Sequence, residues 1–167
     1  MSQYTMFYIR HGNDFIELDA FSRNSVVAQI VHEYAPWEKL AAVGSEELNG
    51  WINDVKEMIE SERASIKRYE DDIQMISTWD NPVEEKMDEI NWRRDEIESM
   101  RQDIEEDESA LWFFRTLLGI EGNMISNARY EDHDPNWDRY YIYIGCETRC
   151  HPTIQDLVTP ENATEEN

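Results

Sequence analysis

The sequence of 167 residues contains little cysteine, glycine or proline, with two, six and five of these residues respectively. A chain of this length can bury a hydrophobic core without disulfides or a structural metal ion. It also lacks a glycine-rich phosphate-binding loop, and its Ser, Cys, His and Asp residues do not assemble into a catalytic triad. We therefore expect one domain without a cofactor, a metal ion or an enzymatic activity.

Basic residues are scarce as well, because Lys and Arg total 15 against 37 Asp and Glu, which gives a net charge of −22. Such a surface repels nucleic acids and anionic membranes and attracts basic proteins, including those that hold DNA or RNA. Solubility is the alternative explanation of the acidity. An apolar content of 40 %, with six Trp and eight Tyr, excludes a disordered acidic chain.

No apolar run is long enough to span a bilayer, and no signal segment is recognisable. These features predict a cytoplasmic protein, in which Cys146 and Cys150 are reduced.

Residues 45–118 have the spacing of a long antiparallel helical hairpin. In the first arm, apolar residues alternate three and four positions apart, and in the second they recur every seven. Between the arms, Asn81 can cap the second helix and Pro82 can take its first position. The seam residues are Leu48, Ile52, Val55, Ile59, Ile66, Tyr69, Ile73 and Ile76, then Val83, Ile90, Ile97, Ile104, Leu111 and Leu118.

Glu62 is the one charged residue in the seam of the first arm. Folding the arms about the turn places it opposite Ile97, with Arg94 and Arg101 one helical turn to either side. We predict that these three residues form a polar layer that fixes the register, since a buried charge needs a partner.

The rest of the chain predicts a small antiparallel sheet. Residues 4–10 and 15–21 form a β-hairpin, a helix beginning near Val26 follows the cap residues 22–25, and residues 37–43 are partly extended. Residues 112–118 are apolar on nearly all sides and should be buried, residues 123–138 form a polar loop, and residues 139–147 form the clearest strand.

The predicted class is α+β, with a sheet, a covering helix and a helical hairpin inserted before the last strand. Residues 1–44 and 119–158 form the body, residues 45–118 the hairpin, and residues 159–167 a solvated tail.

Two motifs suggest other chemistry. Residues 7–12, which end in Arg10-His11-Gly12, resemble the opening motif of the histidine phosphatase superfamily, whose chemistry also needs a second His, a second Arg and an acid. No other histidine lies in the context expected of that second His, so we interpret residues 11–14 as a hairpin turn. Cys146, Cys150 and His151, with His133, could bind zinc, although Cys146 is expected on the inward face of its strand.

Residues 84–108 contain twelve acids against four bases, a balance of −8. Carboxylates at helical spacing imitate the charge density of a phosphate backbone. We therefore expect a non-enzymatic binding protein whose acidic ridge occupies a basic groove on a nucleic-acid-handling protein. The candidate partner-binding residues are Asp88, Glu89, Asp95, Glu96, Glu98, Asp103, Glu105 and Glu106.

The small size, the acidity and the short N-terminal strand resemble the small proteins of bacteriophages of Gram-positive hosts, among them anti-CRISPR and other anti-defence inhibitors. The resemblance implies an inhibitor of a host nuclease complex that acts in the host cytoplasm.

Two alternatives stay open. One is a protein that sequesters a signalling nucleotide in the body, where the available arginines are Arg10, Arg23, Arg129, Arg139 and Arg149. The other is a phage structural or assembly protein that oligomerises through the hairpin. A homodimer is expected in addition, because Trp92, Met100 and Ile104 lie on or beside a flank of the second arm.

Overall fold

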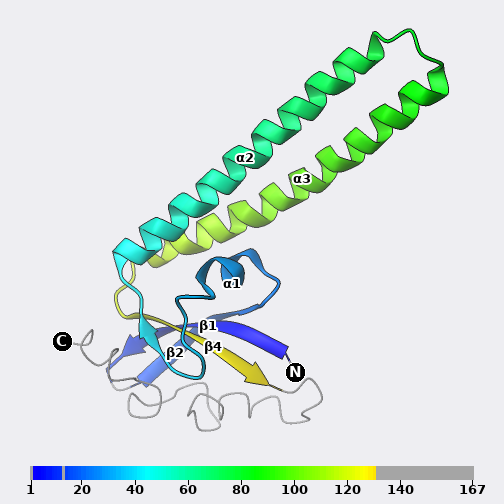
Figure 1. Ribbon diagram of the computed structural model, residues 1–167. Coiled ribbons are helices and arrows are strands. Elements are labelled where there is room, and N and C mark those ends of the chain that lie inside the picture. The colour runs from blue at the N-terminus through cyan, green and yellow to red at the C-terminus, as the bar shows by residue number, and fades with distance from the viewer. Residues whose placement is uncertain (1, 13, 131–167) are drawn as a thin grey trace. The chain divides into compact units, whose positions relative to one another are not determined.

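The computed structural model describes residues 2–12 and 14–130 and confirms the α+β class. The described residues divide into two compact units: one is formed by the residues up to Trp51 together with residues 114–130, and the other by Ile52–Phe113. The elements are labelled in Figure 1. Their bounds are β1 Ser2–His11, β2 Asp14–Ser22, α1 Val26–Val31, β3 Ala41–Ala42, α2 Ser45–Ser77, α3 Val83–Leu117 and β4 Asn123–Tyr130.

The four described strands form one antiparallel sheet in the order β2-β1-β4-β3. β1 and β2 form the predicted β-hairpin, in which His11 pairs with Asp14 and the register shifts between Phe7 and Tyr8. Gly12 has a φ of 65°, a left-handed conformation that glycine adopts without strain. The segment that resembles a phosphatase motif is therefore the end of a strand and its turn.

The position of β4 corrects our prediction of a polar loop over residues 123–138. Asn123–Tyr130 forms an inner strand, paired with β1 on one side and β3 on the other. Its apolar side chains Met124, Ile125 and Ala128 are buried, but so are Asn123, Ser126 and Asn127. The sequence pattern did not indicate this strand, because its polar residues look like those of a loop. They are stable inside the sheet only where they form hydrogen bonds. The predicted strand at residues 139–147 and the predicted tail lie outside the described residues.

Asn127 shows how a polar residue is accommodated inside the sheet. Its Oδ1 accepts a hydrogen bond of 2.7 Å from the Thr5 hydroxyl on β1. Its Nδ2 donates to the backbone carbonyls of His32 and Ala35, both at 2.9 Å. One amide thereby joins two strands to the segment that follows α1.

α1 begins as the sequence predicts. Ser25 is its N-cap, and the Ser25 hydroxyl accepts a hydrogen bond from the Ala28 backbone N–H at 3.2 Å. Val27, Ala28 and Val31 are buried, which makes this short helix one-sided.

Asn123 holds the end of α3 beside the sheet. Its Nδ2 donates to the carbonyls of Leu117 at 3.0 Å and Ile120 at 2.9 Å, which satisfies acceptors left open at a helix C-terminus. The backbone carbonyl of Asn123 accepts a hydrogen bond of 2.8 Å from the backbone N–H of Val43, the residue just after β3. The entry to α2 and the exit from α3 are therefore connected through this residue.

The end of α3 is less buried than we expected. Phe114 and Leu117 are fully buried, and the Phe114 ring lies 5.6 Å from that of Trp51. Trp112, however, is 70 % exposed and Leu118 is 39 % exposed, so the prediction of burial on all sides is wrong. The buried positions are three to four residues apart, which is the spacing of a single helix face.

We expect Asn127→Ala to lower the free energy of unfolding by at least about 2 kcal/mol, because the Thr5 hydroxyl and two buried carbonyls lose their partner. Asn127→Asp has nearly the same shape but directs an oxygen at those carbonyls, and it should be no more stable. Denaturant unfolding measures both, with Asn53→Ala at an exposed position as the control. A loss below 0.5 kcal/mol, the ordinary range for a surface substitution, would contradict the role of this amide.

Candidate functional site

The long helices α2 and α3 run antiparallel and are joined by residues 78–82 (Figure 1). Within this helical hairpin, the buried apolar residues of α2 follow the predicted alternation of three and four. The second arm contributes fewer buried residues. The members of this buried seam are Ile52, Val55, Ile59, Ile66 and Ile76 on α2, and Ile90, Ile97 and Ala110 on α3.

The predicted register and polar layer are wrong. Glu62 lies beside Asp103 and Asp107, six to ten residues farther along α3 than Ile97. Arg94 is exposed, and Arg101 lies 3.6 Å from Glu70 on the surface of the hairpin. The predicted pairing of Glu62 with Arg94 and Arg101 is wrong because long arginine side chains reach solvent from the edge of a seam and need no buried acid.

Glu62 and Asp107 form a pair of acids between the two helices. Asp107 is only 2 % exposed and Glu62 is half-buried. Burial is the largest cause that raises the pKa of Glu62, to about 8, followed by its hydrogen bond with Asp107 and the negative charges of Asp107 and Asp103. Two carboxyl groups can share a hydrogen bond only when one of them is protonated.

Seven of the eight candidate partner-binding acids are exposed as predicted, and Glu89 is the exception. The Glu89 carboxylate accepts hydrogen bonds from Arg93 at 2.7 Å and from the Trp92 indole N–H at 3.0 Å. The bond from Arg93 is the main cause that lowers the pKa of Glu89. Glu89 is thus engaged within the hairpin and is a poor candidate for contact with a partner.

The exposed acids include an aligned set on α3. Asp88, Asp95 and Glu106 are separated by seven and eleven residues, which correspond to about two and three turns of an α-helix. They therefore lie on one side of α3, and all three are exposed. We call these three residues the acidic line.

Trp92 and Arg93 connect the two helices near the turn. The Trp92 ring packs edge-to-face on Tyr69 of α2 with 5.8 Å between centroids, and the Arg93 guanidinium lies 4.3 Å from the Trp92 centroid. Arg93 Nε also lies 3.7 Å from Asp72 of α2. Trp92, predicted on an uncovered flank, is 44 % exposed and packs against this cluster.

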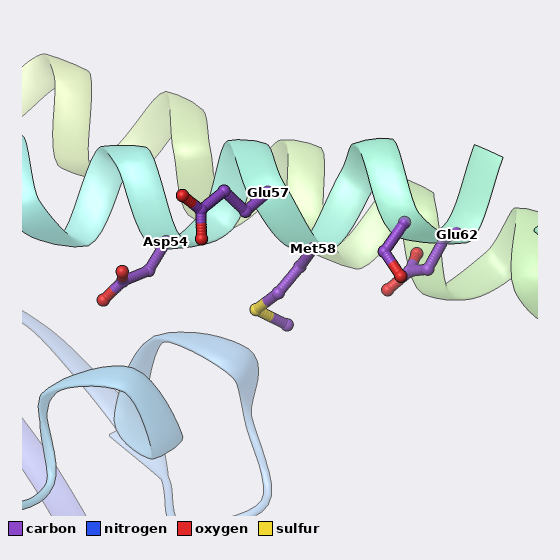
Figure 2. Close-up of a pocket in the computed structure, with 5 residues that line it drawn as sticks. Asp54, Glu57, Met58 and Glu62 are labelled. Carbon is purple, nitrogen blue, oxygen red and sulfur yellow. The ribbon is translucent and has the colours of Figure 1, made fainter. Parts of the chain in front are cut away.

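An open depression runs along α2. It is lined by Asp54, Glu57, Met58, Ser61 and Glu62, which Figure 2 draws as sticks. Its volume is about 480 Å³, and its lining combines carboxylates with one apolar side chain. These groups suit a cationic side chain with an aliphatic stem and disfavour an anion.

Of the arginines proposed for nucleotide binding, Arg23 and Arg129 both adjoin Gln3, whereas Arg10 lies toward the other end of β1. Arg23 hydrogen-bonds Gln3 near the start of β1, and the Arg129 guanidinium lies 3.9 Å from the Trp37 ring centroid. Arg10 lies near the other end of β1, where its N–H donates to the Gly122 carbonyl. Arg139 and Arg149 lie outside the described residues.

Within residues 2–12 and 14–130, no cluster of His, Cys, Asp or Glu could hold a metal ion. Cys146, Cys150, His151 and His133 fall outside these ranges, so the zinc alternative remains a hypothesis. No helix in the described portion of the chain has the length and apolarity needed to cross a membrane. Comparisons with protein-family models, curated proteins and solved structures gave no match.

We expect Arg93→Ala to destabilise the helical hairpin by about 1 kcal/mol or more, because Arg93 is mostly buried and contacts Glu89, Trp92 and Asp72. Arg94→Ala removes the same charge from an exposed neighbour and should change the stability by less than about 0.5 kcal/mol. Loss of helical circular dichroism in urea measures both variants. Equal effects would mean that only net charge matters.

Proposed function

We propose that this chain is a non-enzymatic binding protein whose exposed acids on α3 occupy a basic groove on a protein that handles nucleic acid. The acidic line of Asp88, Asp95 and Glu106 carries the proposal. A row of carboxylates on a long helix is a linear array of negative charge, which such a groove is built to hold.

The charge density supports this match. Residues 84–108 of α3 span about 36 Å, and their twelve acids give about one carboxylate per 3 Å. One strand of DNA carries about one phosphate per 3.4 Å. Subtracting the four bases of the segment leaves about one net charge per 4.5 Å, which is still of the same order.

The distribution of charge between the two helices favours contact of α3 with a partner over a role in solubility alone. Residues 52–77 of α2 have seven acids and four bases, a balance of −3, whereas residues 84–108 have a balance of −8 over a similar length. Over their full lengths α2 and α3 have balances of −5 and −7, because α2 begins with Glu46 and Glu47 and α3 ends near Arg115. Charge for solubility alone has no reason to concentrate on one of two helices. The asymmetry is the pattern expected if α3 is the side that meets a basic partner.

Apolar side chains at the turn of the hairpin favour a protein as that partner. Met75 and Val83 are 58 % and 73 % exposed, and Trp79 and Met87 are also exposed. Protein interfaces combine aromatic residues and Met with a charged rim. These four residues therefore extend the proposed contact beyond charge alone.

The proposal includes a host defence nuclease complex as the target. Its support is the resemblance in size, acidity and N-terminal strand to phage-encoded anti-defence inhibitors. The nucleotide-sequestering alternative is less well supported, since Arg10 lies at the other end of β1 from Arg23 and Arg129, and the Arg129 guanidinium already lies over the Trp37 ring.

The test is competition for a nucleic-acid site. Proteins retained from a bacterial lysate by the immobilised chain are purified, bound to labelled duplex DNA or RNA, and titrated with free chain. Displacement of the nucleic acid supports the proposal. Simultaneous binding of the chain and the nucleic acid would contradict it.

We expect charge reversal of the acidic line, Asp88→Lys with Asp95→Lys and Glu106→Lys, to weaken this competition at least tenfold. Each exposed contact contributes about 0.5–1 kcal/mol, and 1.4 kcal/mol corresponds to a factor of ten. The salt dependence of the remaining affinity should also be flatter.

The matched control reverses three exposed acids outside the hairpin, Asp19, Glu33 and Glu121. It changes the net charge equally and should leave the competition nearly intact. Equal weakening by both sets would reduce the role of the acidic line to long-range attraction.

We further expect a homodimer. Trp112, at 70 % exposure, adds to the exposed apolar side chains on the hairpin, and grouped exposed apolar residues mark protein contacts. Sedimentation at micromolar concentration should show a species of about twice 19.9 kDa. A single species at the monomer mass would contradict this expectation.

A further inference from the structure

The turn of the helical hairpin carries apolar side chains that the hairpin does not bury. Ile76 and Ile90, at 1 % and 8 % exposure, close the buried seam at this end. Of the eleven large apolar side chains that are exposed among the described residues, four lie within residues 75–87, which we call the tip (Figure 1). These four are Met75, Trp79, Val83 and Met87. Exposed apolar residues that are grouped in this way mark contacts with other molecules.

Hydrogen bonds fix the shape of the tip. The Thr78 and Trp79 backbone N–H groups each donate to a carbonyl in the last turn of α2 at 3.0 Å. The Asn81 side-chain amide donates to the Glu85 carboxylate at 3.3 Å. Pro82, directly before α3, restricts the backbone further. A surface that is ordered before binding loses less conformational entropy when it binds, so the tip is suited to a specific contact.

Acidic side chains border the apolar group. Residues 75–87 contain three acids and one base, a balance of −2. Asp80, Glu84 and Glu85 are exposed, whereas Lys86 is half-buried. Carboxylates at the border of a contact favour Lys and Arg on the opposing surface. The surface that fits the tip is therefore apolar at its centre and basic at its border.

The same acids disfavour two other occupants. A second tip would bring its own acids against those of the first, and like charges across a contact are unfavourable. Anionic lipid headgroups would repel the acids for the same reason. A protein with basic residues around an apolar pocket meets neither obstacle.

We propose that the tip enters an apolar pocket, bordered by Lys and Arg side chains, on the protein whose basic groove receives the acidic line. The acidic line begins at Asp88, directly after the tip, so one partner can contact both. This placement rests on the proposed function. Trp79 is the expected central contact, because Trp is enriched among the residues that dominate binding at protein interfaces.

The two contacts respond differently to salt. The acidic line acts through charge, which salt screens. The tip acts mainly through burial of apolar surface, which is not an ionic interaction. The tip should therefore supply the part of the affinity that persists at high salt.

The first measurement uses the nucleic-acid-binding protein purified in the competition test. Trp79→Ala should weaken its binding to the chain at least about tenfold. The loss should be similar at about 0.1 M and about 0.5 M salt, whereas charge reversal of the acidic line weakens binding mainly at low salt. Circular dichroism should show unchanged helix content, since Trp79 lies outside the seam.

A matched pair of double variants separates the tip from apolar surface in general. Val83→Ser with Met87→Ser should weaken binding as Trp79→Ala does. Ile16→Ser with Leu18→Ser removes aliphatic side chains of 42 % and 40 % exposure from β2 and should leave binding unchanged. Equal effects of the two pairs would overturn the assignment of the pocket to the tip.

Photocrosslinking identifies the surface that the tip meets. A benzophenone amino acid replaces Val83, which is 73 % exposed, and in a control chain it replaces Leu18. Irradiation of each chain in a bacterial lysate should join only the Val83 position to the protein that loses its nucleic acid in the competition test. Mass spectrometry should locate the crosslink among apolar residues with Lys or Arg nearby.

The outcomes distinguish this inference from the proposed function. If reversal of the acidic line weakens the competition and the tip variants do not, the proposed function stands and the pocket is overturned. A Val83 crosslink to lipid, to a second copy of the chain or to no protein at all also overturns the pocket. A crosslink within a basic-bordered pocket of a protein that binds no nucleic acid supports the pocket and contradicts the proposed function.

Discussion

The amide of Asn127 is the interaction on which the sheet depends. β4 lies between β1 and β3, and a polar side chain at its centre is stable only if its oxygen and nitrogen are both satisfied. Thr5, His32 and Ala35 provide the partners, and they come from β1 and from the segment after α1. Because β4 follows the helical hairpin in sequence, the sheet is complete only when the chain has returned from α3. Asn123, at the start of β4, fixes the point of return.

The sequence predicted those elements whose pattern is local. The β1–β2 turn, the Ser25 cap and the apolar alternation of α2 each depend on neighbouring residues, and all three are present. β4 was not predictable in this way, because Asn127 looks like a loop residue until its partners are known, and one of them is 122 positions distant. The hairpin register failed for a related reason. A charge at a seam position has three outcomes, namely a buried ion pair, escape to solvent or protonation, and spacing does not distinguish them.

The acids of the hairpin differ in their surroundings. Glu108 pairs with Arg63 across the helices while both side chains stay at least half exposed, Asp95 faces solvent, and Asp107 is buried beside Glu62, whose pKa is raised by burial. Of the eight candidate partner-binding acids, Glu89 alone is withdrawn, because Arg93 at the next turn engages it. The correction required a contact between side chains four residues apart, and sequence could have suggested it, since Glu and Arg at this spacing commonly pair on helices. The placement of Glu62 beside Asp107 had no such signal, because it depends on the register.

Packing of the seam explains why so acidic a hairpin can fold. Each buried Ile or Val contributes about 1.5–3 kcal/mol, so seven of them supply on the order of 10 kcal/mol or more. Two exposed charges repel by only about 1 kcal/mol at 4 Å in water, and salt screens them beyond about 10 Å. The fold therefore permits the acids of α3 but does not require them. Residues 52–77 of α2 form the same seam with a balance of −3, so the −8 of residues 84–108 is not a requirement of the seam.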